Sequence, residues 1–186
     1  MSLVKLGSIA PDGTETPFRY ANVYDLQRTT GPLRLVIAPE ANHTGLLLAL
    51  ASCWHGPYGL LYVLLVSRTA RLPGRYESPG VLSQPELVSF FAEHAAFLET
   101  DGRHAFWVDS SEGEGTLVYD QHNVLYAYGP IEAYETILLE QGFTRAPVRF
   151  PSPHTHHYHP ENDAGEERLL GQWEWRYSPL QEDDDY

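Results

Sequence analysis

The chain has 186 residues with 25 acidic and 12 basic side chains, which give a formal net charge of −13. A chain of this length fits one domain that buries enough apolar surface to fold without a disulfide or metal. Because the charge repels a phosphate backbone, the composition argues against nucleic-acid binding.

The single cysteine and the lengths of the apolar runs bear on where the protein works. Cys53 has no partner for an internal disulfide, and the first residues lack the long apolar stretch of a signal peptide. The apolar runs 44–54 and 58–66 are each too short to span a bilayer. We therefore expect a cytoplasmic protein that does not bind a membrane.

The first half of the chain predicts a strand, a buried helix and a second strand. The apolar run 33–38 is rich in β-strand formers. Residues 45–54 are rich in Leu and Ala and lack β-branched side chains, which favours a helix that is buried on all sides. Gly56-Pro57 ends this helix, and the apolar run 60–66 indicates a central strand.

The second half predicts two or three more helices around an antiparallel meander. A helix begins at the capping box Ser83-Gln84-Pro85-Glu86 and ends at Asp101-Gly102. Residues 104–128 predict a meander with a turn at Asp120-Gln121-His122-Asn123. A further helix covers 131–141, and a short acidic helix follows Pro160. These elements predict an α+β fold, with a single mixed or mainly antiparallel sheet packed against three to four helices.

The end of the chain is strongly acidic. Residues 161–186 hold nine acidic and two basic side chains. We expect a single α+β domain over 1–178 and an acidic, mobile tail over 179–186. Trp173 and Trp175 are candidates to dock this arm on the body of the protein or on a second copy, so a homodimer remains open.

The most distinctive stretch is His154-Thr155-His156-His157-Tyr158-His159, which holds four of the nine histidines. Imidazole is the commonest metal ligand in proteins. In an extended segment, His154 and His156 share one face while His157 and His159 share the other. A straight strand therefore offers at most two histidines to one ion, whereas zinc takes three or four protein ligands.

The remaining ligands must come from elsewhere in the chain. The candidates are Glu40, His43, Asp101, His104, Asp120 and His122. Glu40 and His43 have i, i+3 spacing, so their side chains would converge if one helix included both. We predict a metal site, with zinc as the candidate ion, from His154, His156, His43 and Glu40, with His157 and His159 as alternates. The alternative is a surface strand whose imidazoles form only structural hydrogen bonds.

Catalysis without a metal has little support in the sequence. The chain contains no Gly-x-Ser-x-Gly motif, phosphate-binding loop or dinucleotide-binding fingerprint. Cys53 lies in an apolar run, where a thiol is usually inert. A second group of polar residues is expected at strand ends or turns, namely Asp101, Arg103, His104, Asp120 and His122. An Asp–His pair among them would suit general acid–base chemistry, although turn formation alone explains both aspartates.

Two functions remain open from the sequence. The first is a non-catalytic binding domain for a basic protein or a small ligand, in the manner of bacterial immunity proteins, which it resembles in size and charge without a shared motif. The second is a metal-dependent hydrolase or other metalloenzyme built around the histidines of 154–159. Further ligands that converge on this stretch would favour the second.

Overall fold

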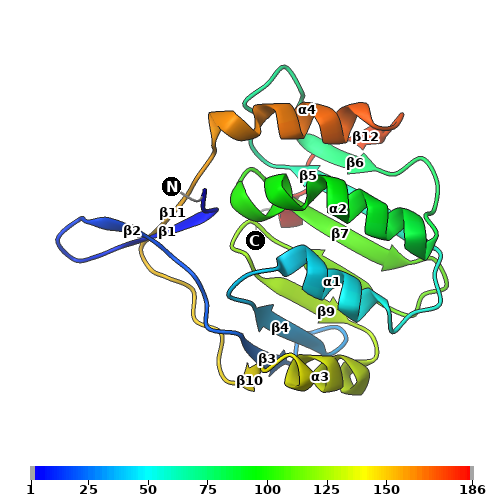
Figure 1. Ribbon diagram of the computed structural model, residues 1–186, viewed down its shortest axis with the longest axis horizontal. Coiled ribbons are helices and arrows are strands. Elements are labelled where there is room, and N and C mark those ends of the chain that lie inside the picture. The colour runs from blue at the N-terminus through cyan, green and yellow to red at the C-terminus, as the bar shows by residue number, and fades with distance from the viewer. Residues whose placement is uncertain (1–2, 185–186) are drawn as a thin grey trace.

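The computed structural model describes residues 3–184, which form an α+β fold of two β-sheets and four α-helices (Figure 1). In spatial order the large sheet consists of β10 (Thr144–Arg145), β3 (Val23–Gln27), β4 (Arg34–Ala38), β9 (Leu125–Tyr128), β8 (Thr116–Tyr119), β7 (His104–Ser110), β5 (Tyr58–Leu64), β6 (Gly74–Glu77) and β12 (Arg176–Ser178). The small sheet consists of β11 (His154–His156), β1 (Leu6–Ile9) and β2 (Glu15–Pro17).

The α-helices are α1 (His43–Ala51), α2 (Gln84–Thr100), α3 (Ile131–Glu140) and α4 (Asp163–Gly171), and they lie along one face of the large sheet (Figure 1). Two short 3-10 helices, η1 (Pro160–Asn162) and η2 (Glu182–Asp184), complete the described elements. Within residues 3–184, no helix is both long and apolar enough to cross a bilayer.

The α+β class and the meander are confirmed, but the prediction of a single sheet is wrong. The large sheet ends at β10 and β12, and β1 and β11 are not part of it. Instead they pair with each other in antiparallel register, with Leu6 opposite His156. The strand pairs are antiparallel throughout the described chain, except that β10 and β3 are parallel.

Both faces of the large sheet are buried in its middle. The helices cover one face, and the small sheet packs on the other. Along β4, Leu35 and Ile37 join the core under the helices, whereas Val36 joins a second core on the opposite face. This alternation is the ordinary two-residue period of a strand. Leu6 of β1 is fully buried in the second core together with Val118, so burial holds β1 against the back of the large sheet.

The expected mobile tail over 179–186 falls partly on residues 185 and 186, which lie outside the described residues. In the described part, Asp184 is buried and forms an ion pair with Arg75 on β6, at 2.5 Å between carboxylate oxygen and guanidinium nitrogen. The last described turn, η2, is therefore in contact with the large sheet.

Candidate metal centre

Three imidazoles from the two sheets come together at one place. His122, His154 and His156 each offer a ring nitrogen, and these three atoms lie within 4.8 Å of one another. The ring centroids are 4.7 Å apart for His122 and His156, 5.2 Å for His122 and His154, and 5.1 Å for His154 and His156. We call this set the histidine trio.

The trio forms because the small sheet is held over the turn between β8 and β9. His154 and His156 lie on β11 and project from the same face, as the two-residue period requires. His122 lies in the turn, which Asp120 shapes by accepting hydrogen bonds at 2.9 Å from the backbone N–H groups of His122 and Val124. Asn123 follows with a φ of 61°, the left-handed conformation that asparagine tolerates.

Two of the three rings are oriented by contacts on their outer nitrogen. Nδ1 of His122 lies 3.1 Å from the Asp120 carboxylate, and Nδ1 of His154 lies 2.9 Å from the carbonyl oxygen of Pro151. Such carboxylate and carbonyl partners are the usual second shell of metal-binding histidines, because they fix the tautomer and the ring direction. They leave Nε2 of each ring as the ligand atom.

The third ring carries an unsatisfied atom. Nε2 of His156 is buried and has no hydrogen-bond partner within residues 3–184. A buried polar atom without a partner is costly, and this one lies beside two further imidazoles. A metal ion shared with His122 and His154 would satisfy this nitrogen.

The electrostatic surroundings keep His156 neutral. Burial, assisted by His122, His154 and Lys5, lowers the pKa of His156 to about 4, although Asp120 acts in the opposite direction. At neutral pH the imidazole therefore has a free lone pair, which is the form that binds a metal.

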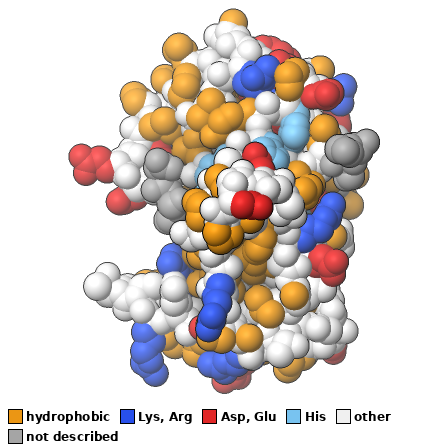
Figure 2. Space-filling model, turned by 90° about the vertical axis from the view of Figure 1, so that its left-hand side faces the viewer, with side chains coloured by type: hydrophobic (Ala, Val, Ile, Leu, Met, Phe, Trp, Pro, Cys, Tyr) orange, Lys and Arg blue, Asp and Glu red, His pale blue; other side chains and the backbone are white. Residues whose placement is uncertain are grey.

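The spacing of the trio suits a small transition-metal ion. Zinc bonds to imidazole nitrogen are about 2.0–2.1 Å long, so the nitrogens of a tetrahedral site lie about 3.4 Å apart. The 4.8 Å limit of the trio can close to this spacing by modest side-chain rotation. Histidine side chains are also visible on the face of the molecule that carries the β1–β2 hairpin (Figure 2).

Glu40 and His43 do not join the trio. The i, i+3 argument required a helix across both residues, but α1 begins at His43 after Asn42, which has a φ of 58°. Both residues instead line a separate cavity of about 170 Å³. There Nδ1 of His43 lies 3.6 Å from the Glu99 carboxylate, and its ring stacks on Tyr119.

The alternates His157 and His159 are on the opposite face of the segment, as predicted. Nδ1 of His157 and Nε2 of His159 lie 3.1 and 2.8 Å from the carbonyl oxygen of Val4. Nε2 of His157 also lies 2.5 Å from the Glu15 carboxylate. These two rings thus attach the histidine segment to the residues just before β1 and to β2.

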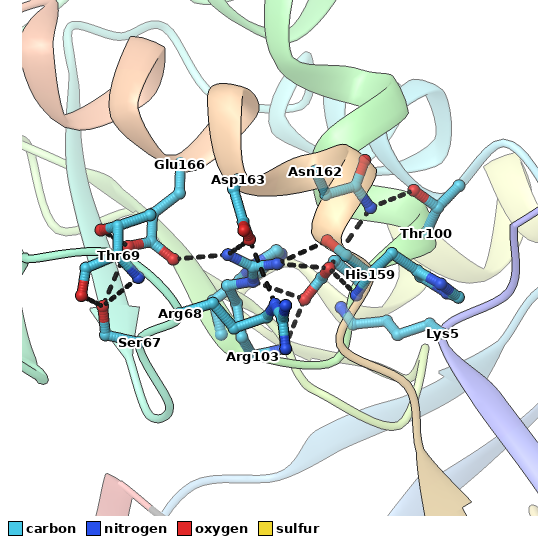
Figure 3. Close-up of polar contacts among 12 residues, drawn as sticks. Lys5, Ser67, Arg68, Thr69, Thr100, Arg103, His159, Asn162, Asp163 and Glu166 are labelled. Atoms are coloured by element: carbon cyan, nitrogen blue, oxygen red, sulfur yellow. Dashed lines mark hydrogen bonds and ion pairs between the residues drawn. The ribbon is translucent and has the colours of Figure 1, made fainter.

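Asp101 belongs to a buried ion network around Arg103. Figure 3 shows Arg103 in this network with Glu166 and Asp163 of α4. Arg103 is fully buried and donates at 2.7 Å to each of Asp101 and Glu166, and at 2.9 Å to the carbonyl oxygen of His159. Asp101 in turn accepts the backbone N–H of His159 at 2.9 Å. Burial raises the pKa of Asp101, but these hydrogen bonds outweigh it and hold the pKa below its usual range.

His104, another candidate from the sequence, is also outside the trio. It is fully buried, and its Nε2 lies 3.2 Å from the carbonyl oxygen of Leu98. Burial, with a contribution from Lys5, lowers the pKa of His104 well below its usual value. Asp101 therefore helps to hold the segment after β11, whereas His104 is part of the core beside Leu98.

Comparison with known proteins gives no relative for this arrangement. No family model matches the chain, and neither the curated proteins nor the solved structures contain a significant match.

Proposed function

We propose that the chain binds a divalent transition-metal ion, with zinc as the best fit, through His122, His154 and His156. The observation that supports this most is the meeting of three ring nitrogens from two sheets. The outer contacts of His122 and His154 and the unsatisfied Nε2 of His156 are what a histidine metal site requires.

The number of ligands favours an open site. Structural zinc sites use four protein ligands, whereas catalytic sites use three and keep the fourth position for water. Within residues 3–184, no fourth His, Cys, Asp or Glu joins the set. Zinc lowers the pKa of a bound water to about 7, which supplies a hydroxide nucleophile at neutral pH. We therefore extend the proposal to a metal-dependent hydrolase.

The surroundings of the trio offer a place for a substrate. The Phe150 ring lies 5.3 Å from the His122 ring and is 41% exposed, so it presents apolar surface beside the centre. Asp120 is committed to His122 and to the turn, so its role is to position the ligand. A substrate with an apolar group next to a hydrolysable bond fits these surroundings best.

The test begins with metal content. Untagged protein is incubated with Zn²⁺, gel-filtered and analysed by mass spectrometry for metal. We expect about one ion per chain in the wild type and none in His156→Ala, because three ligands are the minimum for tight zinc binding. His157→Ala is the matched control from the same segment and should keep its ion. Equal metal content in the two variants would contradict the site.

Hydrolysis is tested separately with 4-nitrophenyl acetate. The rate should rise in proportion to bound zinc in the wild type and stay at background in His156→Ala supplied with the same zinc. If zinc binds stoichiometrically and the rate stays at background, the metal centre stands and the hydrolase is refuted. The ion would then act as a link between the two sheets.

A second candidate function is the non-catalytic binding of a basic protein. It is supported by the net charge of −13, which attracts cationic partners over distances comparable to the Debye length. It is also supported by an acidic groove that shares no residue with the trio.

A further inference from the structure

A groove of about 440 Å³ lies between the N-terminal half of α2, the loop 78–82 and the residues that follow α4. Its aromatic part is formed by Phe90, which is 2% exposed, and by Trp173, whose ring stacks on Phe90 at a centroid distance of 5.3 Å and an angle of 18°. The Trp175 ring contacts the Trp173 ring at a centroid distance of 5.0 Å. At the rim, Val81 is 57% exposed. The groove therefore offers aromatic and aliphatic surface in one place.

The charge of the groove is entirely negative. Glu86 and Glu93 on α2 line it, and among the described residues it has no Lys, Arg or His lining. Hydrogen bonds from Ser83 lower the pKa of Glu86, so this carboxylate stays ionised at neutral pH. Arg176 donates to the carbonyl oxygen of the lining residue Ser78 at 3.1 Å, and its charge is paired with Glu77 at 2.8 Å. Two carboxylates beside an aromatic stack favour a cationic group with an apolar body.

We infer that this groove docks an arginine- or lysine-bearing segment of a basic partner protein. An apolar side chain of the segment would lie on Val81 and Phe90, and the cation would lie between Glu93 and the Trp173 ring. A protein is favoured over a free amine because the net charge of −13 steers a large cationic surface, whereas a small amine gains only the local contacts. The assignment rests on the second proposed function and is independent of the metal centre.

The test uses the peptide acetyl-Leu-Arg-Leu-Arg-amide and ¹H–¹⁵N correlation spectra of the full chain. We expect shift changes confined to residues 78–93 and 172–173. Glu93→Gln should weaken binding about fivefold, since it removes the carboxylate that faces the cation. The matched control is Glu140→Gln on α3, an exposed acid outside the groove, which should change affinity less than about twofold.

A second pair of variants tests the apolar contact. Val81→Ser removes an exposed apolar side chain from the rim, and Leu139→Ser removes one of equal exposure from α3, 57% against 60%. Only Val81→Ser should weaken peptide binding, again by about fivefold in affinity. Both side chains are at the surface, so thermal unfolding should show that each variant folds.

Each other outcome overturns the inference in a distinct way. Shift changes elsewhere, or equal losses in the paired variants, would refute the groove but leave the second function standing. Absence of peptide binding would refute both. Benzylamine that binds as tightly as the peptide would identify a small amine as the occupant. Self-association in sedimentation velocity that Val81→Ser abolishes would identify a second copy of this chain.

Discussion

The two pairs of histidines in the segment 154–159 have the same chemistry but opposite surroundings. His154 and His156 face the turn between β8 and β9, where His122 completes a set of three nitrogens. His157 and His159, which we call the anchor pair, face the residues just before β1, where both contact the carbonyl oxygen of Val4. The alternation of side chains along one short strand separates a candidate metal site from a structural anchor.

The difference lies in which nitrogens are already satisfied. In the anchor pair, both ring nitrogens of His157 have partners, one of them the Glu15 carboxylate. In the trio, Nε2 of His156 is buried and has no hydrogen-bond partner in the described part of the chain. Satisfied polar atoms stabilise a fold, whereas an unsatisfied buried atom next to two further imidazoles has a reason to bind an ion.

The largest expected effect comes from breaking the support of the anchor pair. Asp101→Asn removes the charge that pairs with buried Arg103 and accepts the backbone N–H of His159. Loss of one partner in a buried ion pair leaves an uncompensated charge, and we expect a loss of about 3 kcal/mol in the free energy of unfolding. Urea unfolding followed by tryptophan fluorescence measures it.

Asp101→Asn also tests whether the trio binds zinc independently of the anchor pair. Zinc affinity of Asp101→Asn should stay within about threefold of the wild type, because the second shell of the trio lies elsewhere. Glu77→Gln is the control, since it breaks the exposed Glu77–Arg176 pair and should cost no more than about 0.5 kcal/mol. A parallel fall of zinc affinity and stability would show that the anchor and the trio act as one unit.

The next effect concerns Lys5, which contacts both His157 of the anchor pair and Asp120, the residue that orients His122 of the trio. Its carbonyl oxygen accepts the N–H of His157, and its ammonium group donates to the carbonyl oxygen of Asp120 at 2.9 Å. Burial lowers the pKa of Lys5 to about 7, although Asp120, Asp101 and Glu99 act in the opposite direction. The buried ammonium therefore opposes folding as long as it stays charged.

The direction in which stability changes with pH follows from how tightly the folded and unfolded chains bind the Lys5 proton. Between pH 7 and the unfolded value of 10.5, the unfolded chain holds the Lys5 proton more tightly, so stability rises with pH in this window. From pH 7.5 to 9 the gain should be about 2 kcal/mol. Urea titrations of the wild type and Lys5→Met measure it, and the difference between them isolates Lys5. An equal slope in both proteins would assign the effect to other groups.

The sequence was sufficient for the fold class because local signals agreed with tertiary structure. The capping box at Ser83 and Glu86 begins α2, with the Ser83 N–H donating to Glu86 at 2.8 Å. The meander over 104–128 forms as β7, β8 and β9. The second sheet could not be predicted, because it depends on the pairing of Leu6 with His156, which lie 150 positions apart and carry no local signal.

The candidate site was only partly predictable for the same reason. Periodicity alone placed His154 and His156 together and separated them from His157. His122 was one of six candidates for the third ligand, and its aspartate two positions earlier, in a turn, was the available signal. The choice of Glu40 and His43 assumed a helix across both, whereas the left-handed Asn42 sets the start of α1 at His43.

The smallest effect compares the two carboxylates that hold one histidine of each set. Asp120 contacts His122 of the trio, and Glu15 contacts His157 of the anchor pair. Asp120→Asn keeps an oxygen for the turn but removes the charge behind the ligand, so zinc affinity should fall on the order of tenfold. Glu15→Gln should leave it unchanged, because His157 does not face the ion. Competition with a chromophoric chelator measures both, and equal affinities in the two variants would mean that the carboxylate behind His122 does not tune a metal site.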